Sequence, residues 1–368
     1  MIKVLHISPN TYPKLGQKEH HTKRIWQELA KDVNEYHVFA RSQDNSFSHT
    51  IEGNIHLHLI PKIHSKSRVF MLSSFLVLPL LRKHKITHLT AQSSLLGGLT
   101  AVFLSKLFKL PLLTEIHGEE YFRYLKSNKL FSKLIKFSFS NSTKIRSLSS
   151  SMSDKLKYYG FQKNVILIPN RVNLNLFKIY KDFFEINGKI NLVSVGRFVW
   201  QKNYLELIKK LSNSNLNFHL TLIGGGVEKI NFENYITKNN LIKRVTLIDW
   251  ITQDELAKLI IDSDIYIQSS VSEGMPRTIL EAMALKMPII STNVGSIKGI
   301  LNANNSILIN SDLEDLVLSI NKIYKNYEFR KSIAEQAYND VCEKYEWNKV
   351  FDLYRHEIKT MKYQSTVS

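Results

Sequence analysis

The sequence contains one cysteine, Cys342, so no disulfide can form within the chain. A single thiol is compatible with a reducing compartment. The N-terminal run MIKVLHIS lacks the succession of basic segment, apolar segment and small-residue cleavage site that marks a signal peptide. We therefore expect a cytoplasmic protein.

Long apolar runs are also missing. The longest nearly uncharged one, VFMLSSFLVLPLL at 69–81, is shorter than the about 20 residues that a membrane-spanning helix needs. Two interpretations of this run stay open, a buried core helix and a segment that contacts a membrane surface. At most, we expect peripheral membrane association.

Acidic residues are scarce in the first half of the chain. Residues 1–170 hold 25 Lys and Arg against 10 Asp and Glu, whereas residues 171–368 hold 25 against 22. Most of the net charge of +18 therefore lies before residue 171. This excess suits an anionic partner such as phospholipid headgroups, a polyanionic acceptor or nucleic acid, or it is simply solvated surface. No nucleic-acid-binding module is recognisable, so we do not expect a nucleic-acid partner.

Short runs rich in Ile, Val and Leu alternate with segments of helical period along the whole chain, and they include predicted strands at 55–60, 245–248 and 265–268. This alternation predicts an α/β fold whose parallel sheets are covered by helices on both faces. The pattern restarts at KINLVSVG after an irregular stretch, which predicts two domains. We place the domains at 1–170 and 171–345, with a C-terminal helix at 346–368 that packs back toward the N-terminal domain.

The stretch SEGMPRTILEAMALKMPII, residues 272–290, holds two glutamates eight positions apart, Glu273 and Glu281. Pro276 favours the first turn of a helix, so we predict a helix from about Pro276 to Leu285. Glu273 then lies on the loop before the helix and Glu281 lies within it. The first N–H groups of a helix, here those of Arg277 and Thr278, suit an anion such as phosphate. Two carboxylates beside them suit the hydroxyls of a sugar or a ribose.

This stretch resembles the E-x7-E region of retaining glycosyltransferases of family GT4, which have the GT-B fold of two facing Rossmann-like, doubly wound domains with parallel sheets. Other segments are similar to the family in the same order, namely HISPNTYPKLGQKEHH, TEIHGEE, LIPNRVNLNLF, SVGRFVWQKN, LIGGGVEK and VTLIDWITQDELAKLIIDSDIYIQSS. The resemblance covers the second domain almost throughout and the first only at two segments.

The resemblance implies a retaining, metal-independent transfer of a sugar from a nucleotide diphosphate donor to a hydroxyl of a surface-glycan or lipid-linked acceptor. The catalytic residues would be His117 and Glu273. The donor diphosphate would be bound by Arg197, Lys202, Gly16 and Thr278. The donor sugar would contact Glu273, Gly274, Met275 and Pro276, and the ribose and base would contact Glu281 and Ile251. No metal or other cofactor is implied, and a UDP-sugar is favoured slightly over a GDP-sugar.

Some positions depart from the family pattern. Gln17 follows Gly16 where a second glycine is usual, and Lys286 stands where a helix-ending glycine is common. Ser296 and Gly299 stand where a glycine and a glutamate are frequent. These departures weaken the inference about the donor more than the prediction of the fold. A nucleotide-sugar epimerase shares the GT-B fold and is the alternative function, although the E-x7-E segment argues against it.

Other patterns suggest metals weakly. Asp262-Ser263-Asp264 spells the metal-binding DxD motif of a different glycosyltransferase fold, but we expect Asp264 to cap a helix or face solvent. His56 and His58 share one face of a predicted strand, but no carboxylate or third histidine is spaced so as to complete a metal site. We therefore interpret them as polar surface.

Two segments combine lysines with apolar residues. In 121–140, lysines 126, 129, 133 and 136 follow one helical stripe, and the segment at 62–85 is similarly basic and apolar. Such segments often lie on anionic membranes, although a solvated amphipathic helix has the same pattern. We hypothesise that both segments dock the enzyme on the cytoplasmic face of a membrane, near a lipid-linked acceptor.

Overall fold

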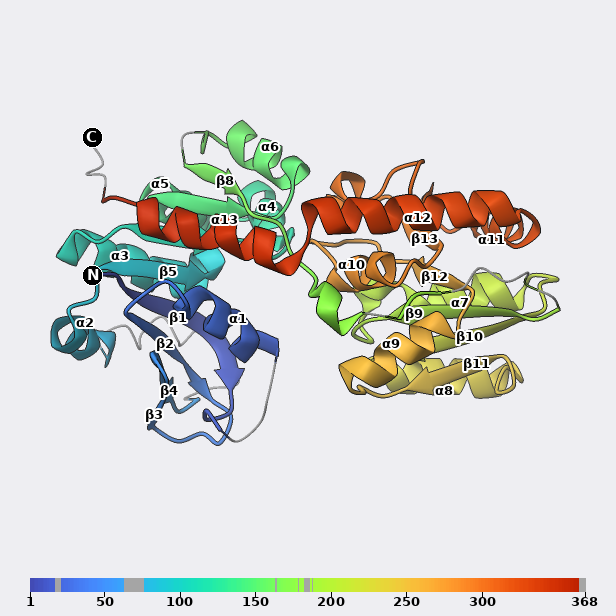
Figure 1. The fold of residues 1–368 in the computed structure, drawn as a ribbon, viewed down its shortest axis with the longest axis horizontal. Coiled ribbons are helices and arrows are strands. Elements are labelled where there is room, and N and C mark those ends of the chain that lie inside the picture. The colour runs from blue at the N-terminus through green and yellow to red at the C-terminus, as the bar shows by residue number, and fades with distance from the viewer. Residues whose placement is uncertain are drawn as a thin grey trace. The chain divides into compact units, whose positions relative to one another are not determined.

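The computed structural model describes residues 1–16, 21–62, 76–162, 164–177, 179–181, 186 and 188–363. The chain forms two compact units. Unit 1 comprises Met1–Ile168 together with Phe351–Ser368, and unit 2 comprises Pro169–Val350. Figure 1 shows a sheet with covering helices in each unit. The boundary placed at residue 170 from the sequence lies within two residues of this division.

The sheet of unit 1 has the strand order β3-β4-β2-β1-β5-β6-β7-β8. All neighbouring pairs are parallel except β3 and β4. The strands are β1 (Lys3–Tyr12), β2 (Glu35–Ser42), β3 (Ser48–Glu52), β4 (Ile55–Ile60), β5 (His88–Gln92), β6 (Leu112–Glu115), β7 (Lys144–Ser147) and β8 (Val165–Leu167). The central strand β1 is buried from Val4 to Ser8, as expected for a strand with helices on both faces.

The helices of unit 1 connect these strands and close the unit. They are α1 (His21–Ala30), α2 (Leu78–His84), α3 (Gly98–Phe108), α4 (Glu120–Ser127), α5 (Lys129–Ser140), α6 (Ser150–Tyr158) and, from Phe351 onward, α13 (Trp347–Thr360), with a π-helical turn, η2, at Ser93–Gly97. Arg355 on α13 pairs with Glu28 and Asp32, which attaches the C-terminal helix to unit 1.

The sheet of unit 2 has six parallel strands in the order β11-β10-β9-β12-β13-β14. The strands are β9 (Ile190–Val195), β10 (Phe218–Ile223), β11 (Val245–Ile248), β12 (Ile265–Gln268), β13 (Ile289–Thr292) and β14 (Ile307–Ile309). Successive strands are added toward one edge from β9 to β11 and toward the other edge from β12 to β14, so the strand order reverses between β9 and β12. In doubly wound sheets, ligands bind at such a switch point, outside the carboxyl ends of the strands.

Helices α7 (Tyr204–Ser212), α8 (Lys229–Lys238), α9 (Gln253–Ile261), α10 (Arg277–Ala284), α11 (Leu316–Lys325) and α12 (Tyr327–Lys344) surround this sheet. Short 3₁₀ turns lie at Leu174–Leu176 (η3), Trp200–Lys202 (η4) and Gly295–Gly299 (η5). One core cluster joins the apolar faces of α7, α8 and α11 to β9 and β10, including Leu207, Phe232 and Ile320. Helix α9 begins with a capping box in which Thr252 and Glu255 bond each other's backbone N–H groups.

The structure corrects three details of the sequence interpretation. The short strands β3 and β14 were not anticipated, and β3 is antiparallel. The segment 121–140 forms two helices, because Asn128 accepts the N–H of Phe131 and begins α5. The apolar run at 69–81 lies mostly outside the described residues, and α2 begins at Leu78.

A buried arginine joins α11 to α12. Arg330 is 2% exposed and donates to the carbonyl oxygens of Ile323 at 2.7 Å and Tyr324 at 3.2 Å. These carbonyls belong to the last turn of α11, whose C=O groups lack intrahelical partners. The guanidinium therefore caps α11 from within the core.

We expect Arg330→Met to lower the free energy of unfolding by about 2–4 kcal/mol, because buried carbonyls lose a charged donor. Urea unfolding would measure the change. The matched control is Lys325→Met at an exposed position, expected within about 0.5 kcal/mol of wild type. Equal stability of the two variants would contradict a capping role for Arg330.

Candidate functional site

The switch point of unit 2 gathers the basic residues predicted to bind a diphosphate. Arg197 lies just after β9 and is exposed, and Lys202 ends the 3₁₀ turn η4 that follows. The loop that holds Glu273 follows β12, the neighbouring strand on the other side of the switch point. Arg197, Lys202 and Glu273 therefore lie outside the carboxyl ends of β9 and β12, where such folds bind ligands.

One oxygen of Glu273 receives three donors. Its Oε1 accepts from Lys202 Nζ at 2.6 Å, Gln268 Nε2 at 2.8 Å and Ser270 Oγ at 2.6 Å. The side chains of Lys202 and Glu273 are only 14% and 12% exposed, so the ion pair is shielded from solvent. Among the described residues, Oε2 of Glu273 has no hydrogen bond. The carboxylate is thus held at one oxygen and open at the other.

The backbone of the Glu273 loop packs against a glycine. Gly295 has φ +55, and a Cβ there would lie 2.0 Å from the carbonyl oxygen of Glu273. No other residue fits, for reasons of both backbone conformation and space. Asn170 also contacts this loop, since its Nδ2 donates to the carbonyl of Met275 at 2.7 Å. The loop from Glu273 through Gly274 to Met275 is therefore held at both of its ends.

Helix α10 begins within one residue of the predicted start, with Pro276 as the N-cap rather than the first helical residue. Proline has no side-chain acceptor, so no cap bonds the first N–H groups. Arg277 is exposed, and the buried Oγ1 of Thr278 has no hydrogen-bond partner among the described residues. This helix start offers donors to an anion.

Glu281 lies on α10 with a half-buried side chain. Burial raises the pKa of Glu281 to about 7, and the nearby Arg277 opposes that rise. A ligand that donates hydrogen bonds to this carboxylate would stabilise its ionised form.

The loop between β11 and α9 holds the residues near the predicted position of the base. Ile251 on this loop is half-buried, and Trp250 beside it is 60% exposed.

One departure from the family pattern, Lys286, has a structural explanation. Lys286 ends α10 with φ 54, the left-handed conformation that a glycine usually supplies. Its Nζ lies 4.8 Å from the ring centroids of both Tyr180 and Tyr338, which are hydrogen bonded to each other at 2.9 Å. Gly299 accepts from the Tyr345 hydroxyl at 3.1 Å, so its carbonyl has a structural partner.

Asp264 of the DxD sequence is also structural. Its Oδ2 accepts the backbone N–H of Asn191 at 2.8 Å, and its Oδ1 lies 3.5 Å from Lys181 Nζ. The side chain is 14% exposed, so the expectation that it caps a helix or faces solvent was wrong. Asp264 instead joins the start of β9 to the start of β12.

His117 of unit 1 follows β6 and contacts a buried carboxylate. Its Nε2 lies 3.2 Å from Glu115 Oε2, which also accepts from Arg146 NH1 at 2.7 Å. The other oxygen of Glu115 accepts from the hydroxyl of Tyr354 on α13. Although burial opposes it, the hydrogen bond from His117 and the charge of Arg146 hold the pKa of Glu115 well below its usual range. An ionised glutamate thus orients the imidazole.

Gly16, the other predicted residue of unit 1, ends the first described segment with φ +83. A Cβ there would meet nothing within 4 Å, so the backbone conformation rather than space favours glycine. Gln17 lies outside the described residues.

Sequence reasoning missed several neighbours of these residues. At the switch point of unit 1, Ser8 and Asn10 both donate to Gln92 Oε1, at 2.7 and 3.0 Å. In unit 2, Gln268 and Ser270, two of the three partners of Glu273, were missed, as was the exposed ring of Trp250. Their common signal is a polar or aromatic side chain within a few residues of the end of a predicted parallel strand.

Comparisons with known proteins agree with this geometry. The family described as Glycosyltransferase Family 4 matches residues 19–176, and the family described as Glycosyl transferases group 1 matches residues 177–340. The two matches adjoin and run through both units. The chain is a GT4-like glycosyltransferase. An uncharacterized glycosyltransferase of Methanocaldococcus jannaschii is 25% identical to it over 92% of this chain and 93% of the relative.

Solved structures share the fold of this glycosyltransferase. Sucrose-phosphate synthase from Thermosynechococcus elongatus has a TM-score of 0.81 at 17% identity, covering 97% of this chain and 99% of that one. HepE of Anabaena in complex with UDP-glucose has a TM-score of 0.76 at 14% identity, covering 98% of this chain and 100% of that one. The lipopolysaccharide outer core galactosyltransferase WaaB has a TM-score of 0.74 at 15% identity, covering 98% of this chain and 99% of that one. The predicted GT-B fold is confirmed.

Within the described residues of the glycosyltransferase, every helix is too short or too polar to cross a bilayer.

The raised pKa of Glu281 predicts a pH-dependent cost to stability. In the unfolded chain the carboxyl ionises near 4.5, and in the folded protein near 7. The folded state therefore loses stability relative to the unfolded state as pH rises from about 4.5 to 7. We expect Glu281→Gln to gain about 2–3 kcal/mol over wild type between pH 5 and pH 8.

Urea unfolding of both proteins at pH 5 and pH 8 measures this gain. Glu335→Gln, at an exposed position on α12, is the matched control and should show no such gain. A Glu281→Gln difference that is constant with pH would show that this carboxyl ionises normally in the folded protein.

Proposed function

We propose that the glycosyltransferase is retaining and needs no metal for transfer, moving a sugar from a nucleotide diphosphate donor to an acceptor hydroxyl. The observation that carries the proposal is the position of Arg197, Lys202 and the α10 start at the switch point of unit 2. Two cations and a helix N-terminus stabilise the negative charge that develops on a departing diphosphate.

The two glutamates take separate parts of the donor. Glu281, whose pKa is raised by burial, accepts the ribose hydroxyls. Glu273 binds a sugar hydroxyl through Oε2, because Oε1 is occupied by Lys202, Gln268 and Ser270. Gly274, Met275 and Pro276 line the sugar, and Thr278 Oγ1 donates to the diphosphate. Ile251 contacts the base, and the exposed ring of Trp250 offers it a stacking surface.

The donor is a UDP-sugar in this proposal, with a GDP-sugar as the second choice. Support comes from HepE, a protein of the same fold that is solved with UDP-glucose. From unit 1, Gly16 contacts the diphosphate, and His117, oriented by Glu115, acts near the reacting carbon. The acceptor hydroxyl attacks on the face that the diphosphate leaves, and the departing phosphate takes its proton, so that the anomeric configuration is kept.

We expect Arg197→Ala and Lys202→Ala each to lower kcat by about 10²-fold or more, because each removes charge stabilisation from the leaving group. Steady-state release of nucleoside diphosphate from donor sugars measures the effect. Lys243→Ala, an exposed lysine of unit 2 after α8, is the control and should retain wild-type turnover. An Arg197/Lys202 double alanine variant with full activity would contradict the mechanism.

The reaction class is tested by product analysis. A transferase releases UDP only when an acceptor is glycosylated or the donor is slowly hydrolysed. If this transferase is retaining, the new linkage keeps the anomeric configuration of the donor. The alternative, a nucleotide-sugar epimerase, would convert UDP-sugar to its epimer without an acceptor. NMR of the sugar product after incubation with UDP-hexoses distinguishes the two outcomes.

For the acceptor, we propose a surface-glycan precursor linked to lipid, used at the cytoplasmic face of a membrane. Support comes from WaaB and from an exposed surface on α3 and α5. Four apolar side chains there are about half or more exposed, Phe103, Leu107, Leu130 and Phe137. Lys106 lies 5.1 Å from the ring of Phe137, and lysines 129, 133 and 136 are exposed around it. Such a basic and apolar surface suits anionic headgroups.

We expect the purified protein to co-sediment with vesicles containing anionic phospholipid at low salt. Leu107→Glu combined with Phe137→Glu should abolish binding, because both positions would carry negative charge against an anionic surface. Leu318→Glu, at a position 70% exposed on unit 2, is the matched control. Wild-type protein that stays in the supernatant would exclude membrane docking while leaving the transferase reaction untouched.

A further inference from the structure

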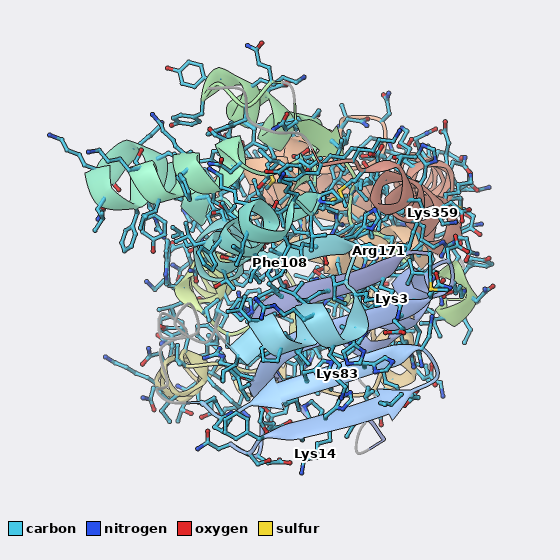
Figure 2. All side chains as sticks on the ribbon, turned by 90° about the vertical axis from the view of Figure 1, so that its left-hand side faces the viewer. Lys3, Lys14, Lys83, Phe108, Arg171 and Lys359 are labelled. Carbon is cyan, nitrogen blue, oxygen red and sulfur yellow. The ribbon has the colours of Figure 1, made fainter. Side chains whose placement is uncertain are left out.

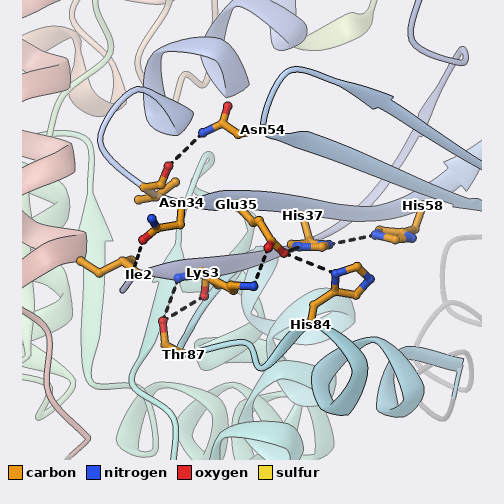
Figure 3. A network of polar contacts seen from close by, with 10 residues as sticks. Ile2, Lys3, Asn34, Glu35, His37, Asn54, His58, His84 and Thr87 are labelled. Atoms are coloured by element: carbon orange, nitrogen blue, oxygen red, sulfur yellow. Dashed lines mark hydrogen bonds and ion pairs between the residues drawn. The ribbon is translucent and has the colours of Figure 1, made fainter.

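A cluster of histidines lies at one edge of the unit 1 sheet, away from the residues assigned to sugar transfer. Strand pairing places His37 on β2 directly beside His56 on β4. His84, the last residue of α2, packs on them, with its ring centroid 4.3 Å from that of His37. Figure 3 shows His37 and His84 bonded to Glu35, with His58 bonded to the other side of the His37 ring. In Figure 2, α2, with Lys83 labelled, lies over this part of the sheet.

The cluster is not polar surface, so the interpretation of His56 and His58 from the sequence was wrong. His37 is fully buried, His58 is 8% exposed, and His56 and His84 are half-buried. Parallel pairing of β2 with β4 and the position of α2 supply the third and fourth imidazoles. One ring nitrogen from each of His37, His56 and His84 lies within 4.8 Å of the others.

Glu35 fixes the tautomers of two of these rings. Its Oε2 accepts from His37 Nε2 at 2.9 Å and from His84 Nδ1 at 3.3 Å. In a neutral imidazole, the nitrogen that does not donate carries a lone pair. His37 therefore presents a lone pair at Nδ1, where it accepts from His58 Nε2 at 3.0 Å, and His84 presents one at Nε2.

Two nitrogens of the cluster are buried without a partner. His84 Nε2 and His56 Nδ1 have no hydrogen bond among the described residues. Buried polar atoms are nearly always satisfied, so an unpaired pair beside a third imidazole requires an explanation.

We propose that His37, His56 and His84 bind a zinc ion. Imidazole nitrogen bonds zinc at about 2.0–2.1 Å, so the ligand nitrogens of a tetrahedral site lie about 3.4 Å apart. The three nitrogens here lie within 4.8 Å of one another, and small rotations of the imidazole rings would bring them to that spacing. A carboxylate that receives the second N–H of ligating histidines is the usual support of such sites, and Glu35 supplies it to two of the three. Zinc would replace the N–H of His58 at His37 Nδ1, and a water molecule would complete the four ligands.

The zinc ion would have a structural role and would not take part in transfer. His37 and His56 lie near the amino ends of β2 and β4, and His84 precedes β5. His117 follows the carboxyl end of β6, at the opposite end of the same parallel sheet. The ion would join β2, β4 and α2 and hold the helix on the sheet edge.

Isothermal titration of the full-length, chelator-treated protein with Zn²⁺ tests the proposal. We expect one ion per chain, a Tm that rises with Zn²⁺, and visible absorption typical of tetrahedral coordination when Co²⁺ replaces Zn²⁺. His56→Gln and His84→Gln should each weaken binding at least tenfold, and Glu35→Gln should weaken it about 10–100-fold. His356→Gln removes an exposed histidine on α13 of the same unit and should bind zinc like wild type.

Circular dichroism of each metal-free variant separates loss of binding from loss of folding. Folded wild-type protein that takes up no Zn²⁺, or folded His56→Gln and His84→Gln variants that bind as tightly as wild type, would overturn the proposal. Removal of zinc should lower Tm but leave turnover at low temperature unchanged. Turnover that stops on chelation and returns with Zn²⁺ would overturn the structural role.

Discussion

Convergence of three donors on Oε1 of Glu273 is the interaction around which unit 2 arranges its site. Lys202 comes from the turn after β9, Gln268 from the end of β12, and Ser270 from the loop that follows. A charge-assisted bond shielded from water is stronger than an exposed ion pair, so the three segments are held in one geometry. The same loop has Gly295 pressed against its backbone and Asn170 bonded to it. The site is therefore rigid before any ligand arrives, which limits the ordering that binding must supply.

Both units have a doubly wound sheet, but the two ends of the unit 1 sheet are used differently. At the carboxyl ends, Glu115 and Arg146 support His117, and Ser8 and Asn10 meet Gln92 beside the switch point. Toward the amino ends, the ion pair of Lys3 and Glu35 meets a group of histidines at positions 37, 49, 56, 58 and 84. Parallel strands bring like ends together, so side chains distant in sequence become neighbours in both places. Because the length of the strands separates the two groups, residues at one end of the sheet can be substituted without altering the contacts at the other end.

The sequence predicted features that depend on neighbours along the chain. Pro276 and the apolar period after it located α10 to within a residue, and continuous apolar runs located β4, β11 and β12 to the residue. Features that depend on register were missed. The sequence around His56 does not indicate that His37 and His84 are its neighbours, since only the β2–β4 pairing and the position of α2 bring the three residues together. A single helix over 121–140 was expected because the lysines follow helical spacing across Asn128, although this residue is the N-cap of α5. Lys286 shows that a missing glycine need not change the backbone when two neighbouring tyrosine rings contact the side chain of the substitute.

The division of the chain has a consequence for its biosynthesis. Unit 1 takes its last helical residues from Phe351 onward, after the whole of unit 2. Until they emerge from the ribosome, Glu115 lacks the hydroxyl of Tyr354, Glu28 and Asp32 lack Arg355, and Lys144 lacks Glu357. At about 5–20 residues per second, translation of unit 2 delays these contacts by roughly 10–35 seconds. Unit 1 therefore completes its contacts with α13 only after the whole of unit 2 has been translated.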